Sequence, residues 1–100
     1  MKKLLFTVAF ALVSVSFAHA QIPTNVVIQI LKAEDARRYD AVLENLMKSP
    51  NAAVRERAAL AGGRIGDERA IPALTELLEN EAAINTCATA AFAIGEIESI

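Results

Sequence analysis

The stretch Val54–Leu78 constrains the fold of this 100-residue chain most strongly, because it has the pattern of two short amphipathic helices joined by a Gly-Asp turn. Its apolar residues recur at the spacing of three and four that one face of a helix requires. Gly66 suits the left-handed conformation that ends a helix, and Pro72 stands in the first turn of the next helix, where no backbone N–H is needed. The stretch therefore predicts a helix–turn–helix unit.

The unit is repeated. Ala58–Ile65 resembles Ala90–Ile97 at a shift of 32 residues, and Ala41–Met47 resembles Pro72–Leu78 at a shift of 31. Periods in this range are typical of solenoids, in which each helix pair packs only on its neighbours. A plain helical bundle is the alternative, and the recurring Ala-Ala segment favours the repeat. We expect an all-α fold, an α-solenoid of antiparallel helix pairs.

The helices can be placed along the chain. We expect them around Val26–Leu31, over Ala41–Met47, from the cap Asn51 to Gly66, from Ile71 onward and over Ala82–Ile97. The charged run Lys32–Arg38 is expected to form the first turn between helices, and the β-branched Val26–Ile28 also suits a strand. Gly62 stands where a large apolar residue would pack. In the last helix the expected buried residues are Ala90, Ala91, Phe92, Ile94 and Ile97.

The N-terminus has the layout of a secretory signal peptide. Lys2 and Lys3 precede an apolar run, Leu4–Phe17, and Ala18-His19-Ala20 supplies small residues for cleavage between Ala20 and Gln21. The run of 14 residues is shorter than the roughly 20 that span a bilayer, although an uncleaved anchor is the alternative. We expect residues 1–20 to be the signal and 21–100 the repeat array. The protein would then be periplasmic or secreted, with only transient membrane contact.

Charge and cysteine content exclude several function classes. Without Lys2 and Lys3 the chain has 8 Lys and Arg against 12 Asp and Glu, a net charge near −4, which excludes the basic footprint of a nucleic-acid binder. The single Cys87 cannot form an internal disulfide; we expect a small buried apolar residue, with an intermolecular bridge or a nucleophile as alternatives. The only histidine, His19, lies in the proposed signal.

No catalytic pattern is present. The sequence has no Gly-rich phosphate loop, no metal-ligand spacing and no Ser/His/Asp set, so we expect no catalytic residue, metal or cofactor in these 100 residues. The carboxylates Glu76, Glu79 and Glu81 are interpreted as a solvated helix face.

Two polar groups are candidates for other roles. Gly66, Asp67 and Arg69 are expected to build a structural turn in which Asp67 accepts backbone N–H groups, with Arg69 or Arg55 pairing to acids of adjacent repeats. A binding ridge is the alternative. Arg37, Arg38 and Tyr39 are the candidate partner contact, because Arg and Tyr are enriched at interface hot spots.

Residues Asn51–Ile97 resemble the short bacterial HEAT-like repeats of the phycobilisome-lyase type. The matching residues are Val54-Arg55, Ala58-Ala59, Ala61-Gly62-Gly63, Ile65-Gly66-Asp67 and Arg69-Ala70-Ile71-Pro72-Ala73-Leu74. Glu98 departs from the pattern by replacing the turn glycine. Some HEAT-repeat proteins bind iron through His-Glu pairs, which this chain lacks beyond residue 20. About two and a half repeats are present, fewer than the three or so that a stable array needs, so we expect a fragment of a longer protein.

The resemblance implies an interaction scaffold that binds a protein or peptide along the stacked second helices, without catalysis in this segment. The alternative is the N-terminal array of a longer exported enzyme, because Ile30–Arg37 followed by repeats is similar to the start of proteins that join such arrays to a cyclophilin-type prolyl isomerase. A bilin lyase subunit is a third hypothesis, and it fits poorly with a secretory signal.

Overall fold

Helices make up the fold. The computed structural model describes residues 21–99, and the proposed signal peptide, Ala20 included, lies outside the described residues. The elements are α2 (Thr24–Ala36), α3 (Ala41–Leu46), α4 (Ala52–Ile65), a 3₁₀ helix η1 (Glu68–Ala70), α5 (Ile71–Asn80) and α6 (Ile84–Glu98). No strand occurs between residues 21 and 99, so the expected all-α class is confirmed for this part of the chain.

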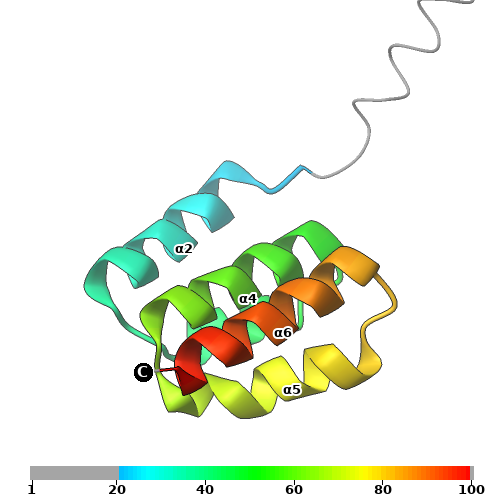
Figure 1. Ribbon diagram of the computed structural model, residues 1–100. Helices are drawn as coiled ribbons and strands as arrows, with labels where there is room; N and C mark the ends of the chain where they lie inside the picture. The colour runs from blue at the N-terminus through cyan, green and yellow to red at the C-terminus, as the bar shows by residue number, and fades with distance from the viewer. Residues whose placement is uncertain (1–20, 100) are drawn as a thin grey trace, which may run out of the picture.

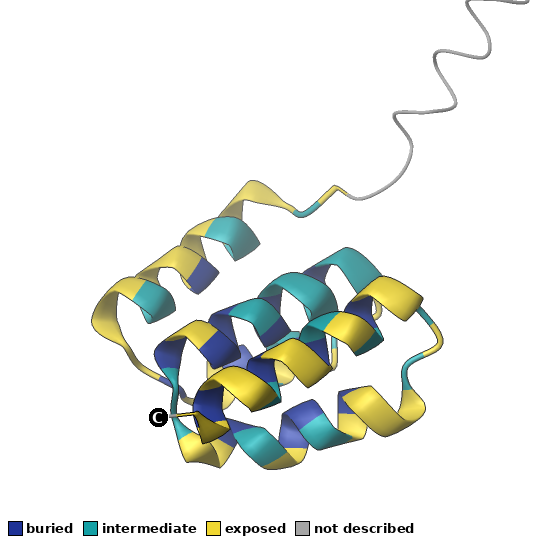
Figure 2. Ribbon diagram, in the orientation of Figure 1, coloured by how far each residue is buried: buried dark blue, intermediate teal, exposed yellow. Residues whose placement is uncertain are grey.

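The first helices of the successive units lie side by side. Figure 1 shows α2, α4 and α6 in one row, with α4 in contact with both of its neighbours. Of the second helices, α3 packs on α4 and α5 packs on α6. Buried residues occupy the faces that the helices turn toward one another, as Figure 2 shows. One continuous core results, and its largest fully buried side chains are Ile30, Leu43, Met47, Leu74 and Thr86.

The ends of α4 agree with the sequence prediction. The side-chain oxygen of Asn51 accepts a hydrogen bond of 2.9 Å from the backbone N–H of Ala53, which satisfies one of the open donors at the helix start. At the other end Gly66 adopts φ 78°, and its N–H donates to the carbonyl of Gly62 at 3.1 Å. Glycine has no Cβ to oppose this left-handed conformation, so the helix ends there.

The expected turn at Lys32–Arg38 is wrong, because α2 continues to Ala36 and ends at Arg37, which adopts φ 49°. The charged residues in the last two turns of α2 are compatible with a helix, because each is either exposed or paired. Lys32 is exposed to solvent, while Glu34 forms ion pairs with Arg57 and with Arg64 of α4. The charged segment therefore connects α2 to α4 through ion pairs instead of forming a turn. Val26–Ile28 also lies within α2, so the strand alternative for these residues is excluded.

The expected buried face of α6 is partly wrong. Ala90 and Ile97 are buried and Ile94 is half-buried, but Ala91 is exposed and Phe92 is 58% exposed. Neighbouring helices cover α6 on one side only, the side that faces α4 and α5. Phe92 lies on the uncovered side, where helical periodicity alone cannot tell a covered face from an open one.

Two glycines of α4 are packing positions. A Cβ built at Gly63 would lie 2.8 Å from the Cα of Ala93, so the absence of a side chain lets α6 approach closely. At Gly62 a Cβ would lie 2.8 Å from the terminal methyl of Met47. The sequence indicated lost packing at Gly62, and this is wrong, because the side chain of Met47, the residue that follows α3, fills the space.

Candidate interaction groove

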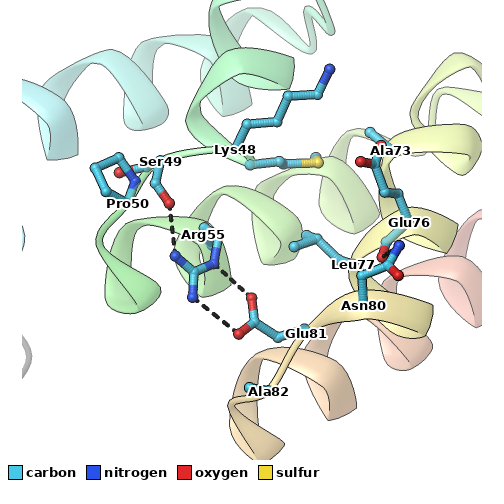
Figure 3. Close-up of a pocket in the computed structure, with 11 residues that line it drawn as sticks. Lys48, Ser49, Pro50, Arg55, Ala73, Glu76, Leu77, Asn80, Glu81 and Ala82 are labelled. Atoms are coloured by element: carbon cyan, nitrogen blue, oxygen red, sulfur yellow. Dashed lines mark hydrogen bonds and ion pairs between the residues drawn. The ribbon is translucent and has the colours of Figure 1, made fainter.

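A groove of about 520 Å³ lies between the α3–α4 connection and the C-terminal half of α5. Three buried side chains, Met47, Ala73 and Leu77, contribute the apolar part of its lining. Figure 3 shows the groove with polar residues around them. The complete lining consists of Met47, Lys48, Ser49, Pro50, Arg55, Ala73, Glu76, Leu77, Asn80, Glu81 and Ala82.

An ion pair between Arg55 and Glu81 closes one end of the groove. The Arg55 guanidinium donates to the two carboxylate oxygens of Glu81 at 2.6 and 3.0 Å and to the carbonyl of Ser49 at 2.7 Å. Glu81 also accepts from the backbone N–H of Ala83 at 3.0 Å. The pair therefore ties the first turn of α4 to the loops before α4 and after α5 (Figure 3).

The pair is charged at neutral pH. The side chains of Arg55 and Glu81 are only 20% and 5% exposed, so water screens them weakly. Hydrogen bonds from Arg55, and then from the Ala83 backbone, lower the pKa of Glu81, while the hydrogen bond to Glu81 raises the pKa of Arg55. Arg55 thus pairs with an acid of the loop that leads into the next unit. This bidentate geometry fixes the groove wall.

Three other polar residues of the lining, Lys48, Glu76 and Asn80, are exposed to solvent. Asn80 is exposed, and its amide donates to the carbonyl of Glu76 at 3.2 Å. Glu76 and Glu79 are exposed on α5, as expected for a solvated face, whereas Glu81 is the paired and largely buried acid described above. Within residues 21–99 no three potential ligands gather into a metal site. The groove thus combines an apolar lining with exposed polar side chains.

The structure brings Gly66, Asp67 and Arg69 together in one turn. Asp67 accepts from the backbone N–H of Arg69 at 2.9 Å and thereby caps η1. The Arg69 guanidinium donates to the same carboxylate at 2.6 to 3.1 Å and lowers the pKa of Asp67. Arg69 therefore pairs within its own turn and not with an adjacent repeat, and its side chain remains 74% exposed.

Arg37, Arg38 and Tyr39 do not form one exposed patch. The two arginines are exposed, but Tyr39 is only 7% exposed and belongs to the core, which corrects its assignment as a partner contact. Its position matches Ala70 in the next unit at the shift of 31 residues, and both positions face inward. The Tyr39 hydroxyl is buried without a hydrogen-bond partner among the described residues, and burial raises the pKa of Tyr39 to about 12.

The remaining sequence candidates lie apart from the groove. Gln21, on the C-terminal side of the proposed cleavage site, is exposed, and its carbonyl accepts from the side-chain amide of Asn51 at 3.1 Å. Cys87 is half-buried rather than fully buried, with its sulfur 3.4 Å from the carbonyl of Leu78. None of the helices between residues 21 and 99 is both long and apolar enough to cross a bilayer.

Sequence reasoning missed most of the groove lining. Met47 and Leu77 were recognised as apolar helix positions, but nothing in the pattern indicated a hollow beside them. The available signal was the aligned ends of the two second helices, which place Ser49 and Asn80 two residues after the corresponding apolar residues Met47 and Leu78. That alignment brings both helix ends to the same side of the molecule.

Comparison with known proteins agrees with this architecture. A family model described as HEAT repeats matches residues 25–95, which includes nearly all of α2 through most of α6. Searches of curated proteins and of solved structures find no match to the chain. The match covers well over half of the sequence, and it includes the groove and the turn formed by Gly66, Asp67 and Arg69. The chain belongs to the HEAT repeat family.

Proposed function

We propose that this protein is an exported scaffold that binds a protein or peptide partner, built as an α-solenoid of antiparallel helix pairs. The groove between α3 and α5 is the observation that carries the proposal. HEAT repeats commonly serve as protein-interaction scaffolds, and membership of the family supports that role. The groove has a volume of about 520 Å³, and its lining combines apolar residues with a few polar groups, as the linings of binding sites do.

The fixed position of the two loops that border the groove supports its role as a docking surface. The Arg55–Glu81 pair and its bonds to Ser49 and Ala83 hold both loops that border the groove. A wall fixed in advance loses less conformational entropy on binding, so more of the contact free energy contributes to affinity. Export rests on the sequence of residues 1–20, whose charged start, apolar run and Ala-His-Ala ending support a cleaved signal.

Two exposed asparagines provide a matched test. Asn80 lines the groove, whereas Asn85 lies outside its lining, in the first turn of α6. A photo-crosslinking amino acid is introduced at one or the other position in cells that make the protein. We expect a defined crosslinked product from position 80 and none from position 85. Equal products at both positions, or a product from position 85 alone, would contradict the proposal.

Export is tested by the N-terminal sequence of the recovered protein. A chain that begins at Gln21 supports cleavage after Ala20, and a retained Met1 on the exported or cell-associated chain contradicts it.

A further inference from the structure

Gln21 becomes the first residue of the chain if the signal is removed after Ala20. It is exposed and precedes α2 by two residues. Its backbone carbonyl accepts the hydrogen bond of 3.1 Å from the side-chain amide of Asn51, the residue that caps α4. The side-chain amide of Gln21 forms no hydrogen bond with any residue between 21 and 99. The fold therefore uses the carbonyl of this residue and leaves its side chain free.

The residues that follow Gln21 are held in place. Ile22 is half-buried and lines a small hollow on α4 together with Leu60. The carbonyl of Pro23 accepts hydrogen bonds of 3.0 and 3.1 Å from two backbone N–H groups in the first turn of α2. The ordered part of the fold thus begins at the Gln21 carbonyl, and the amine of a new chain end would lie just outside it.

A glutamine with a free α-amine can react within itself. The amine nitrogen attacks the side-chain carbonyl carbon Cδ, and the new C–N bond closes a five-membered lactam. The bond from Cδ to the side-chain nitrogen breaks, and this nitrogen leaves as ammonia with one proton from the amine. The step needs no oxidant and no second reactant. Because both reacting groups belong to one residue, they are already close together.

We propose that the exported protein carries pyroglutamate at position 21. The inference rests on the proposed export and on cleavage after Ala20. Ring closure consumes the two groups of Gln21 that the fold does not use, and it keeps the carbonyl that Asn51 binds. A free α-amine is mostly protonated at neutral pH, so the ring also removes one positive charge from the chain end. The product has no amine for an aminopeptidase to recognise.

Mass spectrometry of the N-terminal peptide of the exported protein tests the proposal. Trypsin cuts after Lys32, so the peptide spans residues 21–32. We expect this peptide to be lighter by one ammonia molecule than its sequence requires, with fragment ions that place the loss at the first residue. We also expect stepwise chemical sequencing of the intact chain to be blocked, because that reaction needs a free amine.

Two controls separate the modification from losses during handling. A synthetic peptide of residues 21–32 is carried through the same digestion and should keep its ammonia. The matched variant is Gln21→Asn, which retains a side-chain amide but is one methylene shorter, so its ring would be four-membered and strained. The N-terminal peptide of this variant should keep a free amine. Equal ammonia loss from the synthetic peptide or from the variant would overturn the proposal.

The outcomes distinguish this inference from the proposed function. An N-terminal peptide that begins at Gln21 and keeps both its amine and its amide overturns the modification and leaves export and cleavage standing. A peptide that begins before Gln21 overturns the cleavage and the modification with it. Failure of the scaffold function would appear independently, as the absence of a crosslinked product from position 80.

Discussion

Arg55 and Glu81 lie 26 residues apart in the sequence and are joined by a bidentate pair of hydrogen bonds, 2.6 and 3.0 Å long. Replacing Arg55 by methionine removes both bonds and leaves the Glu81 carboxylate in a site that is only 5% exposed. We expect the free energy of unfolding to fall by about 2 kcal/mol, since hydrogen bonds to charged groups contribute about that much. Chemical denaturation measures the change. The control Arg69→Met breaks an exposed pair and should cost much less.

The same pair predicts a dependence on pH. The pKa of Glu81 is lower in the folded protein than in the unfolded chain, where a glutamate titrates at about 4.3. Its stabilising contribution is therefore fully present above that value and is lost as the pH falls through the folded pKa. The stability difference between the wild type and Arg55→Met should be constant near neutral pH and shrink in acid. A difference that grows in acid would refute this account of the pair.

Replacing each of three glycines by alanine should change the stability of the protein by different amounts. Gly63→Ala places a Cβ against the backbone of Ala93 and should destabilise the protein by about 1–3 kcal/mol, as overpacking does. Gly95 occupies the corresponding position of α6, with nothing within 4 Å of its missing Cβ, so Gly95→Ala should stabilise the helix by about 0.5–1 kcal/mol. In Gly62→Ala the added Cβ comes too close only to the flexible end of Met47, while Ala70 and Leu74 lie at ordinary contact distance, so the effect should fall between the other two. Thermal unfolding of the three variants checks the order.

Tyr39 is a convenient reporter because the chain has one tyrosine and no tryptophan. Its tyrosinate absorbance should appear near pH 12 in the folded protein and near pH 10, its ordinary value, in denaturant. Because the folded pKa is raised, the stability linked to the protonated phenol is present below about pH 10 and is lost as the pH rises further.

The unpartnered hydroxyl of Tyr39 predicts the effect of its removal. Tyr39→Phe keeps the buried ring and removes a polar group that has no partner among the described residues, so the variant should be about 1 kcal/mol more stable than the wild type. The gain should widen above about pH 10, where only the wild type must keep a phenol protonated in order to stay folded. A destabilised variant would show that the hydroxyl has a bonding partner.

The two faces of α6 should differ in their tolerance of substitution. Ile97 is 3% exposed, so Ile97→Ala removes core contacts and should cost about 2–4 kcal/mol. Phe92 is 58% exposed, and Phe92→Ala should change stability by less than about 1 kcal/mol. Urea unfolding of both variants measures the contrast. Similar large costs at the two positions would mean that the uncovered face of α6 is packed in solution.

Sequence patterns predicted the helices well where local chemistry decides the structure. The cap at Asn51, the left-handed Gly66 and the proline-bearing start of α5 follow from side-chain and backbone preferences of single residues. They failed where a neighbouring helix decides. The extension of α2 through Lys32 depends on packing across the repeat, and so does the exposure of Phe92. The groove depends even less on local sequence, because it forms between two segments and the spacing of its lining residues does not indicate a cavity.

The proposed docking surface is tested most directly by amide hydrogen exchange of the protein alone and bound to the partner captured through position 80. Binding at the groove slows exchange in the segments that line it, the end of α3 and the C-terminal half of α5 with its following loop. We predict protection there and unchanged exchange along α2. Protection confined to α2 or to the exposed face of α6, with the α3 and α5 segments unaffected, would contradict the assignment of the groove as the binding site.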